Sequence, residues 1–225
     1  MGERLGPKLM AEFLGSLFLV YVIISSAILA YDILGADLGT SVIYIGLATG
    51  FWLFVLVAMF GPVSGAHFNP AVTIALLATK DIDGKTAAAY IPVQIIGGLV
   101  GTLFAHLTFY HTIPVIWTVS EVARPGGCYF SEFLGTFMLL ATIYGCVRSK
   151  VPGWFIALAV GLVVGGGIIT TSATMFVNPM VTIARVFTYA IAGIRPFDVG
   201  PFIVAQIVGA LAAAGVFSYL YPKES

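Results

Sequence analysis

The chain has 225 residues, of which 60% are hydrophobic and 9% are charged, and its formal net charge is zero. Soluble domains carry about 25% charged residues, so this composition excludes an ordinary soluble protein and indicates an integral membrane protein in a lipid bilayer. A net charge of zero gives no reason to expect a nucleic-acid partner.

Six apolar segments follow one another along the chain, and each reaches the roughly 20 residues that a helix needs to cross a bilayer. The segments cover residues 9–31, 38–60, 86–109, 129–147, 151–173 and 199–221. Arg4 and Lys8 precede the first segment as in a signal peptide, but the segment is too long and lacks a small-residue cleavage site, so we expect it to be retained. The sequence predicts one all-α membrane domain over residues 1–225.

Positive charges are unevenly divided between the two sides that six crossings define. The side with both termini and loops 61–85 and 148–150 carries seven Lys and Arg residues, and the other side carries three. One of the seven is Lys223, close to the C-terminus. Cytoplasmic loops are enriched in Lys and Arg, so both termini of this multi-pass protein are expected in the cytoplasm, below the plasma membrane.

One short apolar stretch occurs twice. NPAVTIA begins at Asn69 and recurs as NPMVTIA at Asn178, with Ala71 replaced by Met180. Asn as N-cap and Pro at the first helical position are helix start signals, and both apolar stretches are too short to span a bilayer. Two re-entrant half-helices are therefore expected over residues 69–79 and 178–188, beginning at the pairs Asn69–Pro70 and Asn178–Pro179.

The two stretches belong to a larger duplication. Residues 11–20 resemble residues 131–140, and residues 90–98 resemble residues 202–210, which aligns Glu12 with Glu132, Gln94 with Gln206 and Gly97 with Gly209. The repeats cover about 1–109 and 129–221 and are joined by loop 110–128. Each repeat holds three crossings, and an odd number inverts the second repeat relative to the first.

An inverted pair of half-helices would enter from opposite faces and meet at their N-termini near the midplane. Both helix dipoles then direct their positive ends to the centre, and Asn69 and Asn178 offer hydrogen-bond donors there. Extended backbone before each half-helix is tolerable at this depth only where it lines a wet cavity. We expect that backbone to include Gly65, Ala66, His67, Ala173 and Thr174, and the path to repel protons and cations.

Glu12 and Glu132 lie inside predicted spans, where a charged carboxylate is costly. They could couple transport to ions, or they could accept hydrogen bonds from loop backbone. One glutamate for each half-helix favours the second interpretation, which also applies to Gln94 and Gln206. The small residues Gly97, Gly98, Gly101, Gly209 and Ala210 are typical of close helix packing.

This pattern resembles the aquaporin or major intrinsic protein family. The resemblance rests on AEFLG at the first span, SGAHFNPAVT, the second NPx box and the duplication, and it covers nearly the whole chain. It implies six helices plus two half-helices and a homotetramer with a pore in each subunit. It also implies passive conduction of water or small neutral solutes. The three histidines do not cluster with cysteines or carboxylates at a metal-ligand spacing, so we expect no metal site and no cofactor.

The sequence departs from the family pattern in ways that concern the solute. Ala becomes Met180 in the second box, and Val181 occupies the position where the family commonly has a filter arginine. An ungapped count from the two boxes adds Thr49, Gly166 and Met175 to the filter, which then has no aromatic ring and no fixed charge. The resemblance thus implies an aquaglyceroporin-like member that passes glycerol-like polyols or uncharged metalloid hydroxides.

Arg185 lies one turn after Val181 on the same helix face. It could guard the outer mouth, or it could extend to the membrane interface. A secondary transporter is the alternative function, because inverted repeats and broken helices occur there too. An ion channel would need a ring of charges along the path, and an enzyme would need a nucleophile with a base; the sequence indicates neither.

Overall fold

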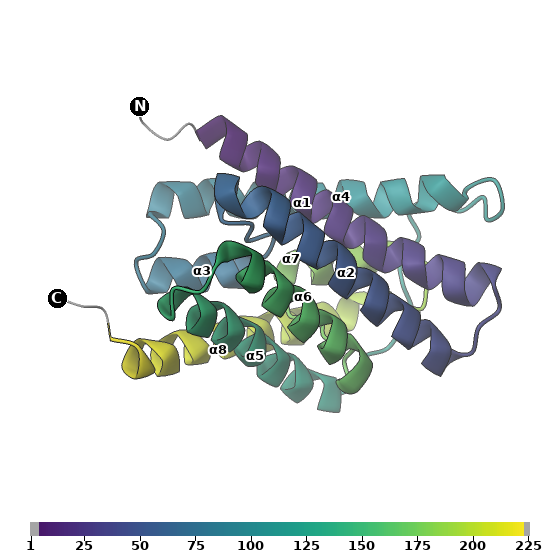
Figure 1. The fold of residues 1–225 in the computed structure, drawn as a ribbon. Coiled ribbons are helices and arrows are strands. Elements are labelled where there is room, and N and C mark those ends of the chain that lie inside the picture. Colours follow the sequence, from purple (N-terminus) through teal and green to yellow (C-terminus); the bar gives the residue numbers. More distant parts are fainter. Residues whose placement is uncertain (1–4, 223–225) are drawn as a thin grey trace.

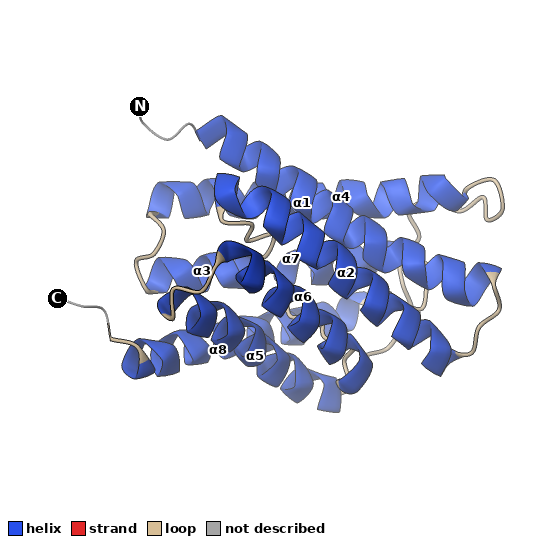
Figure 2. Ribbon diagram, viewed as in Figure 1, coloured by secondary structure: helices blue, strands red, loops and turns tan. Residues whose placement is uncertain are grey.

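The computed structural model describes residues 5–222, which form helices joined by loops (Figure 2). Arg4 and Lys223, two of the charges used for orientation, lie outside the described residues. The helices are α1 (Leu5–Ala27, continued by π-helical Ile28–Ile33), α2 (Leu38–Ser64), α3 (Pro70–Ala78), α4 (Gly84–Phe109), α5 (Gly127–Arg148), α6 (Gly153–Thr170), α7 (Pro179–Ala184, continued by the 3-10 turn Arg185–Phe187) and α8 (Pro196–Leu220).

Six of these helices are long and apolar enough to cross a membrane: α1 with its extension, α2, α4, α5, α6 and α8. The short helices α3 and α7 lie between them, which confirms the expected fold of six spans and two half-helices. Figure 1 places the start of α1 and the end of α8 at the same end of the bundle, as an even number of crossings requires.

Glycines set the spacing of the helix pairs in the same way in both repeats. A Cβ atom at Gly97 of α4 would lie 2.5 Å from the carbonyl oxygen of Phe13 in α1. A Cβ atom at Gly209 of α8 would lie 2.4 Å from the carbonyl oxygen of Phe133 in α5. Only glycine allows backbones to approach this closely, so the duplicated glycines have the packing role that small residues have in membrane proteins.

An aspartate precedes the first residue of α2 and of α4, outside the apolar part of each span. Asp37 accepts a hydrogen bond from the Thr40 amide, and Asp83 accepts from the amides of Lys85 and Thr86, at 3.0 Å in each case. The Thr86 hydroxyl also donates to Asp83, and these bonds hold the pKa of the Asp83 carboxyl below its usual value. Both residues therefore act as N-caps.

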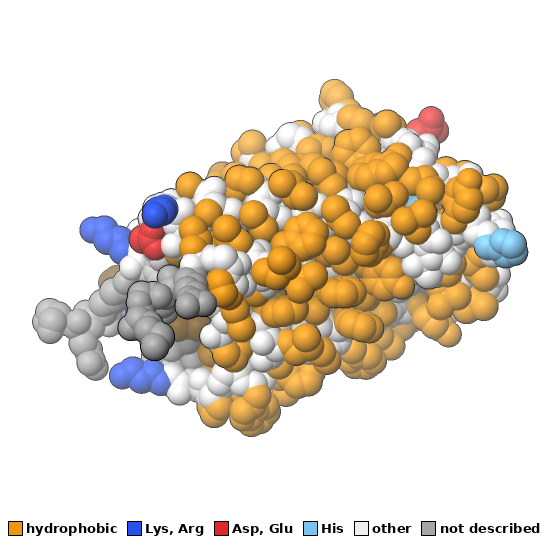
Figure 3. Space-filling view, turned by 90° about the horizontal axis from the view of Figure 1, so that it is seen from above, with side chains coloured by type: hydrophobic (Ala, Val, Ile, Leu, Met, Phe, Trp, Pro, Cys, Tyr) orange, Lys and Arg blue, Asp and Glu red, His pale blue; other side chains and the backbone are white. Residues whose placement is uncertain are grey.

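The outer surface of the bundle is apolar. Figure 3 shows hydrophobic side chains over most of one face, with Lys and Arg side chains gathered at one end. Large side chains such as Phe51, Leu162 and Val204 are more than 60% exposed on three different spans. A surface of this kind faces lipid or other subunits, so the chain is a multi-pass membrane protein.

The second half-helix is shorter than the expected range 178–188. Helix α7 ends at Ala184, and the chain then makes one 3-10 turn. The carbonyl oxygen of Arg185 accepts from the amide of Ile194, and the carbonyl oxygen of Val186 accepts from the amide of Ser120. These bonds to neighbouring loops replace the helical hydrogen bonds and end the helix early.

Candidate functional site

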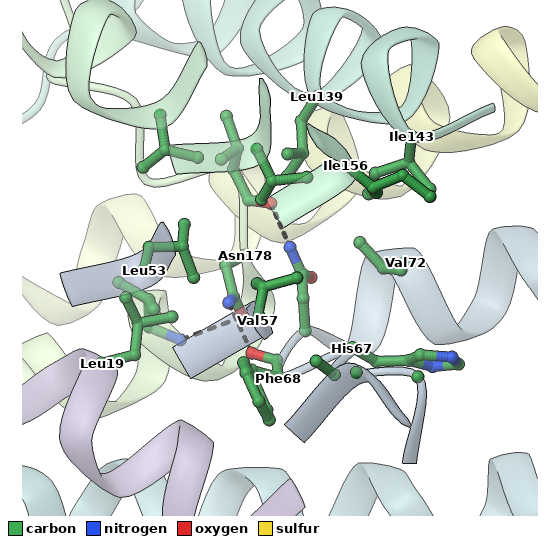
Figure 4. Close-up of a pocket in the computed structure, with 18 of the residues that line it drawn as sticks. Leu19, Leu53, Val57, His67, Phe68, Val72, Leu139, Ile143, Ile156 and Asn178 are labelled. Carbon is green, nitrogen blue, oxygen red and sulfur yellow. Dashed lines mark hydrogen bonds between the residues drawn. The ribbon is translucent and has the colours of Figure 1, made fainter. Parts of the chain in front are cut away.

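The two half-helices meet at their asparagines. The side-chain amide of Asn69 donates to the carbonyl oxygen of Val177, and that of Asn178 donates to the carbonyl oxygen of Phe68, both at 2.8 Å (Figure 4). Each side-chain oxygen accepts from the start of its own helix, Asn69 from the Ala71 amide and Asn178 from the Met180 and Val181 amides. Each asparagine therefore caps one half-helix and holds the loop of the other. Both positive helix ends point to this junction.

The sequence predicts extended loops before the half-helices, and this expectation is wrong. Both loops contain left-handed residues at matching positions. Gly65, Ala66 and Phe68 have positive φ in the first repeat, and Thr174, Met175 and Val177 have positive φ in the second. This conformation is strained for residues other than glycine, most of all for a β-branched one. It persists only where neighbouring groups hold the backbone in place.

Two buried glutamates hold these loops. The carboxylate of Glu12 accepts from the amides of His67 and Phe68, and that of Glu132 accepts from the amides of Phe176 and Val177. The distances lie between 2.6 and 3.0 Å. The glutamines repeat the same symmetry: Gln94 donates to Glu12 and to the Thr73 hydroxyl, and Gln206 donates to Glu132 and to the Thr182 hydroxyl.

A cavity of about 630 Å³ runs past this junction along the bundle. It extends from Asp81 and Trp154 at one end to Thr49 and Arg185 at the other. Figure 4 shows Asn178 among apolar side chains such as Leu53 and Val57. Of the residues expected on the path, Thr49, Gly65, Ala66, His67, Asn69, Met175, Asn178, Val181 and Arg185 line this cavity.

Gly166 is not on the cavity wall, and Ile168 is. Val160, Val164 and Ile168 recur every four residues on the cavity side of α6, so a residue two positions before Ile168 lies about 200° around the helix. The ungapped count from the second box placed the position two residues too early. The cavity wall at this level therefore includes an isoleucine side chain where the count gave an open glycine.

Ala173 and Thr174 also lie off the cavity, although they were expected to line it. A turn closed by the Thr174 amide on the Thr171 carbonyl oxygen carries them away from the cavity after α6 ends. Met175, Phe176 and Val177 take their place on the wall. Phe176 and Ile168 were not among the residues expected on the cavity; the four-residue period of apolar side chains in α6 was the available signal for Ile168.

Thr49 is a polar position at the end of the cavity that also contains Arg185. Its side chain is completely buried, and its hydroxyl has no hydrogen-bond partner within residues 5–222. A buried hydroxyl without a partner is uncommon. It lies in the cavity wall with Ile168, Met175 and Val181 and offers a donor and an acceptor to whatever occupies the space.

Met180 packs away from the cavity, which explains the single difference between the two boxes. A Cβ atom at Gly98 of α4 would lie 2.3 Å from the Met180 sulfur, so the methionine occupies space that the glycine leaves. The position that matches Gly98 in the other repeat is Ala210, and the position that matches Met180 is Ala71. The larger side chain faces the smaller partner, and Ala71 and Met180 are both completely buried.

Comparison with known proteins agrees with this architecture. The model of the major intrinsic protein family matches residues 4–175. The chain is 37% identical to aquaglyceroporin AqpS of Rhizobium meliloti, covering 95% of this chain and 89% of that protein. The chain belongs to the major intrinsic protein family. It is also 32% identical to aquaporin AqpM of Methanothermobacter marburgensis, over 96% of this chain and 98% of that protein.

A solved structure shares the fold of this family member. The aquaglyceroporin of Plasmodium falciparum superposes with a TM-score of 0.77 and covers 95% of this chain and 96% of its own, at 21% sequence identity. The two helices and two loops that form the cavity junction therefore belong to a known arrangement of spans and half-helices.

Proposed function

We propose that the chain is a passive channel for water and small uncharged solutes such as glycerol, and that it excludes ions and protons. The observation that carries the proposal is the continuous cavity with two asparagine-capped helix N-termini at its middle. The positive ends of both dipoles oppose a cation there, whereas a neutral solute meets donors and loop carbonyl groups. Relatives named aquaglyceroporin and aquaporin support the same function.

The outer constriction favours solutes larger than water. We assign it to Thr49, Ile168, Met175 and Val181, which line the cavity; the Phe176 ring lies in the wall next to Met175. Three apolar walls and one hydroxyl suit a solute with carbon on one side and hydroxyl groups on the other. Glycerol-like polyols and uncharged metalloid hydroxides are therefore the solute classes that we propose.

Swelling of proteoliposomes tests this proposal directly. The unchanged protein should pass both water and glycerol, and Val181→Phe should lower glycerol flux at least tenfold with a smaller effect on water. Val204→Phe adds the same bulk on the exposed side of α8 and serves as the matched control. Water flux without passage of any larger solute in the unchanged protein would refute the proposed solute range.

The glutamate contacts favour a channel over the alternative of a secondary transporter. Both carboxylate oxygens of Glu12 and of Glu132 accept hydrogen bonds from loop amides or side chains. A coupling site must bind and release its ion as its exposure alternates, and these oxygens are already occupied. Glycerol flux should show weak temperature dependence and no response to a proton or sodium gradient; coupling to either ion would support the transporter.

We also propose a homotetramer in the plasma membrane with both termini in the cytoplasm. In five of the spans, only 33–39% of the residues in the most apolar 18-residue stretch are buried inside the chain. The remaining side chains can contact lipid and other subunits. Native mass spectrometry of the detergent-solubilised protein tests the tetramer. Protease access to tags at the two ends in intact cells tests the orientation.

A further inference from the structure

Arg185 is a charged side chain in the wall of the cavity. Its residue is 4% exposed, so it does not extend to the membrane interface. Among the described residues that line the cavity, one further side chain carries a carboxylate or a guanidinium group, and this is Asp81 at the opposite end. Asp81 is bound to Arg148, which leaves Arg185 as the strong local charge of the outer half.

The guanidinium group of Arg185 lies further back toward the centre of the pore than its position in the sequence suggests. Arg185 follows the last residue of α7, and its side chain reaches back to the loop that precedes this helix. Its Cζ atom lies 3.4 Å from the ring centroid of Phe176, which lines the cavity next to Met175 and two residues before Asn178. The charge therefore sits at the level of the proposed constriction.

The surroundings fix this position. The Nε atom of Arg185 donates to the carbonyl oxygen of Ala192. The Phe176 ring contacts Phe202 edge to face at 5.2 Å, and the Phe176 amide is held by Glu132 at 2.8 Å. A guanidinium group on an aromatic face in a desolvated site is favourably placed, so ring and charge form one rigid unit.

The two terminal nitrogens of this guanidinium group are free to donate hydrogen bonds to a solute. Within residues 5–222, its two terminal nitrogens make no hydrogen bond and no carboxylate lies within ion-pair distance. Arg124 also approaches the Phe176 ring, at 5.1 Å, but its nitrogens donate to the carbonyl oxygens of Ile191 and Gly193. Arg124 thus adds positive potential while Arg185 supplies the free donors.

We propose that Arg185 supplies the positive charge of the outer constriction from one turn beyond Val181, rejects cations there and donates hydrogen bonds to the passing solute. The inference rests on the proposed channel function. It separates two properties that a filter arginine would combine: the small Val181 side chain leaves room for the solute, and Arg185 selects by charge. The channel then admits solutes larger than water without admitting cations of the same size.

Urea and guanidinium ion test the inference because they have nearly the same shape and differ in charge. A fixed charge about 5 Å from a passing cation, at an effective dielectric constant of about 20, slows the cation on the order of 100-fold. Arg185→Met keeps the length of the side chain and removes the charge. We expect the ratio of guanidinium to urea flux in proteoliposomes to rise at least tenfold, with urea flux changing less than about threefold.

Two further variants separate charge from structure. Arg185→Lys retains the charge and should keep the flux ratio low. The double variant Val181→Arg with Arg185→Val moves the charge to the adjacent turn, and it should restore a low ratio while it narrows the passage for glycerol. Arg195→Met is the matched control, because Arg195 is 40% exposed, bound to Asp198 and off the cavity.

The outcomes distinguish this inference from the proposed function. Water, glycerol and urea flux all no higher than that of empty liposomes in the unchanged protein would refute the channel itself. Normal urea flux together with an unchanged ratio in Arg185→Met would overturn only the role of Arg185. An equal rise in Arg195→Met would also overturn it, because the effect would then come from general outer-surface charge.

Discussion

Replacing Gly209 by alanine would disturb the closest helix contact of the second repeat. The added Cβ atom would lie 2.4 Å from the carbonyl oxygen of Phe133, whereas ordinary contacts begin near 3.4 Å. The obstacle is backbone, so α5 and α8 must separate by about 1 Å at this point. Overpacking of this kind costs about 1–3 kcal/mol, of which the better helix propensity of alanine offsets up to about 1 kcal/mol.

The expected net loss is about 1–2 kcal/mol, which for a chain of this size lowers Tm by about 2–8 °C. The displacement also reaches the pore, because Phe133 follows Glu132, whose carboxylate positions the loop before Asn178. Glycerol flux per folded channel should therefore fall at least threefold. Thermal unfolding in detergent and proteoliposome swelling measure the two effects.

The same helix provides the control. A Cβ atom at Gly215 of α8 would meet no atom within 4 Å, so Gly215→Ala should leave Tm unchanged or raise it slightly, with normal flux. If Gly209→Ala melted at or above the temperature of Gly215→Ala, the close contact would not set the spacing of α5 and α8, and the reasoning from backbone distance would be refuted.

Three further predictions concern the junction and the end of the cavity at Asp81. Gly98→Ala and Met180→Ala should each lower Tm, and the double variant should lose less than the sum, with a coupling of about 1–3 kcal/mol; strictly additive losses would mean that the two residues do not share one space. Glu132→Gln should cost about 2–3 kcal/mol and abolish glycerol flux, because an amide NH2 would face a loop amide that needs an acceptor; an unchanged Tm would contradict this role. Arg148→Gln should change stability by less than about 1 kcal/mol, because the bond to Asp81 lies near the surface, and a larger loss in a thermal scan would show a more important contact.

The sequence predicted those features that follow from the conformational preference of the residues themselves. Asn-Pro pairs start helices wherever they occur, so both half-helices were expected within one residue of their observed starts at Pro70 and Pro179. The left-handed loop residues could not be read in the same way. Ala66, Phe68 and Val177 prefer other conformations, and distant glutamates that bind the loop amides impose this one.

Rotation of α6 about its axis was another property that local sequence did not determine. The count back from Asn178 assumed a fixed loop length, and an error of two residues moved the prediction from Ile168 to Gly166, on a different side of the helix. Packing against α2 settles the rotation instead: a Cβ atom at Gly161 would lie 2.6 Å from the carbonyl oxygen of Gly50. A filter residue on a helix is best placed from such glycine contacts.

The duplication in the sequence indicates where the Arg185 side chain points. At the offset of 109 residues that relates the two boxes, Val181 corresponds to Val72 and Arg185 corresponds to Leu76. Both members of both pairs line the cavity, so the position four residues after each NPx valine faces the path by the symmetry of the fold. One repeat places leucine there and the other places arginine. The symmetry therefore fixes where the side chain points, and the break in symmetry gives one half of the pore a charge that the other half lacks.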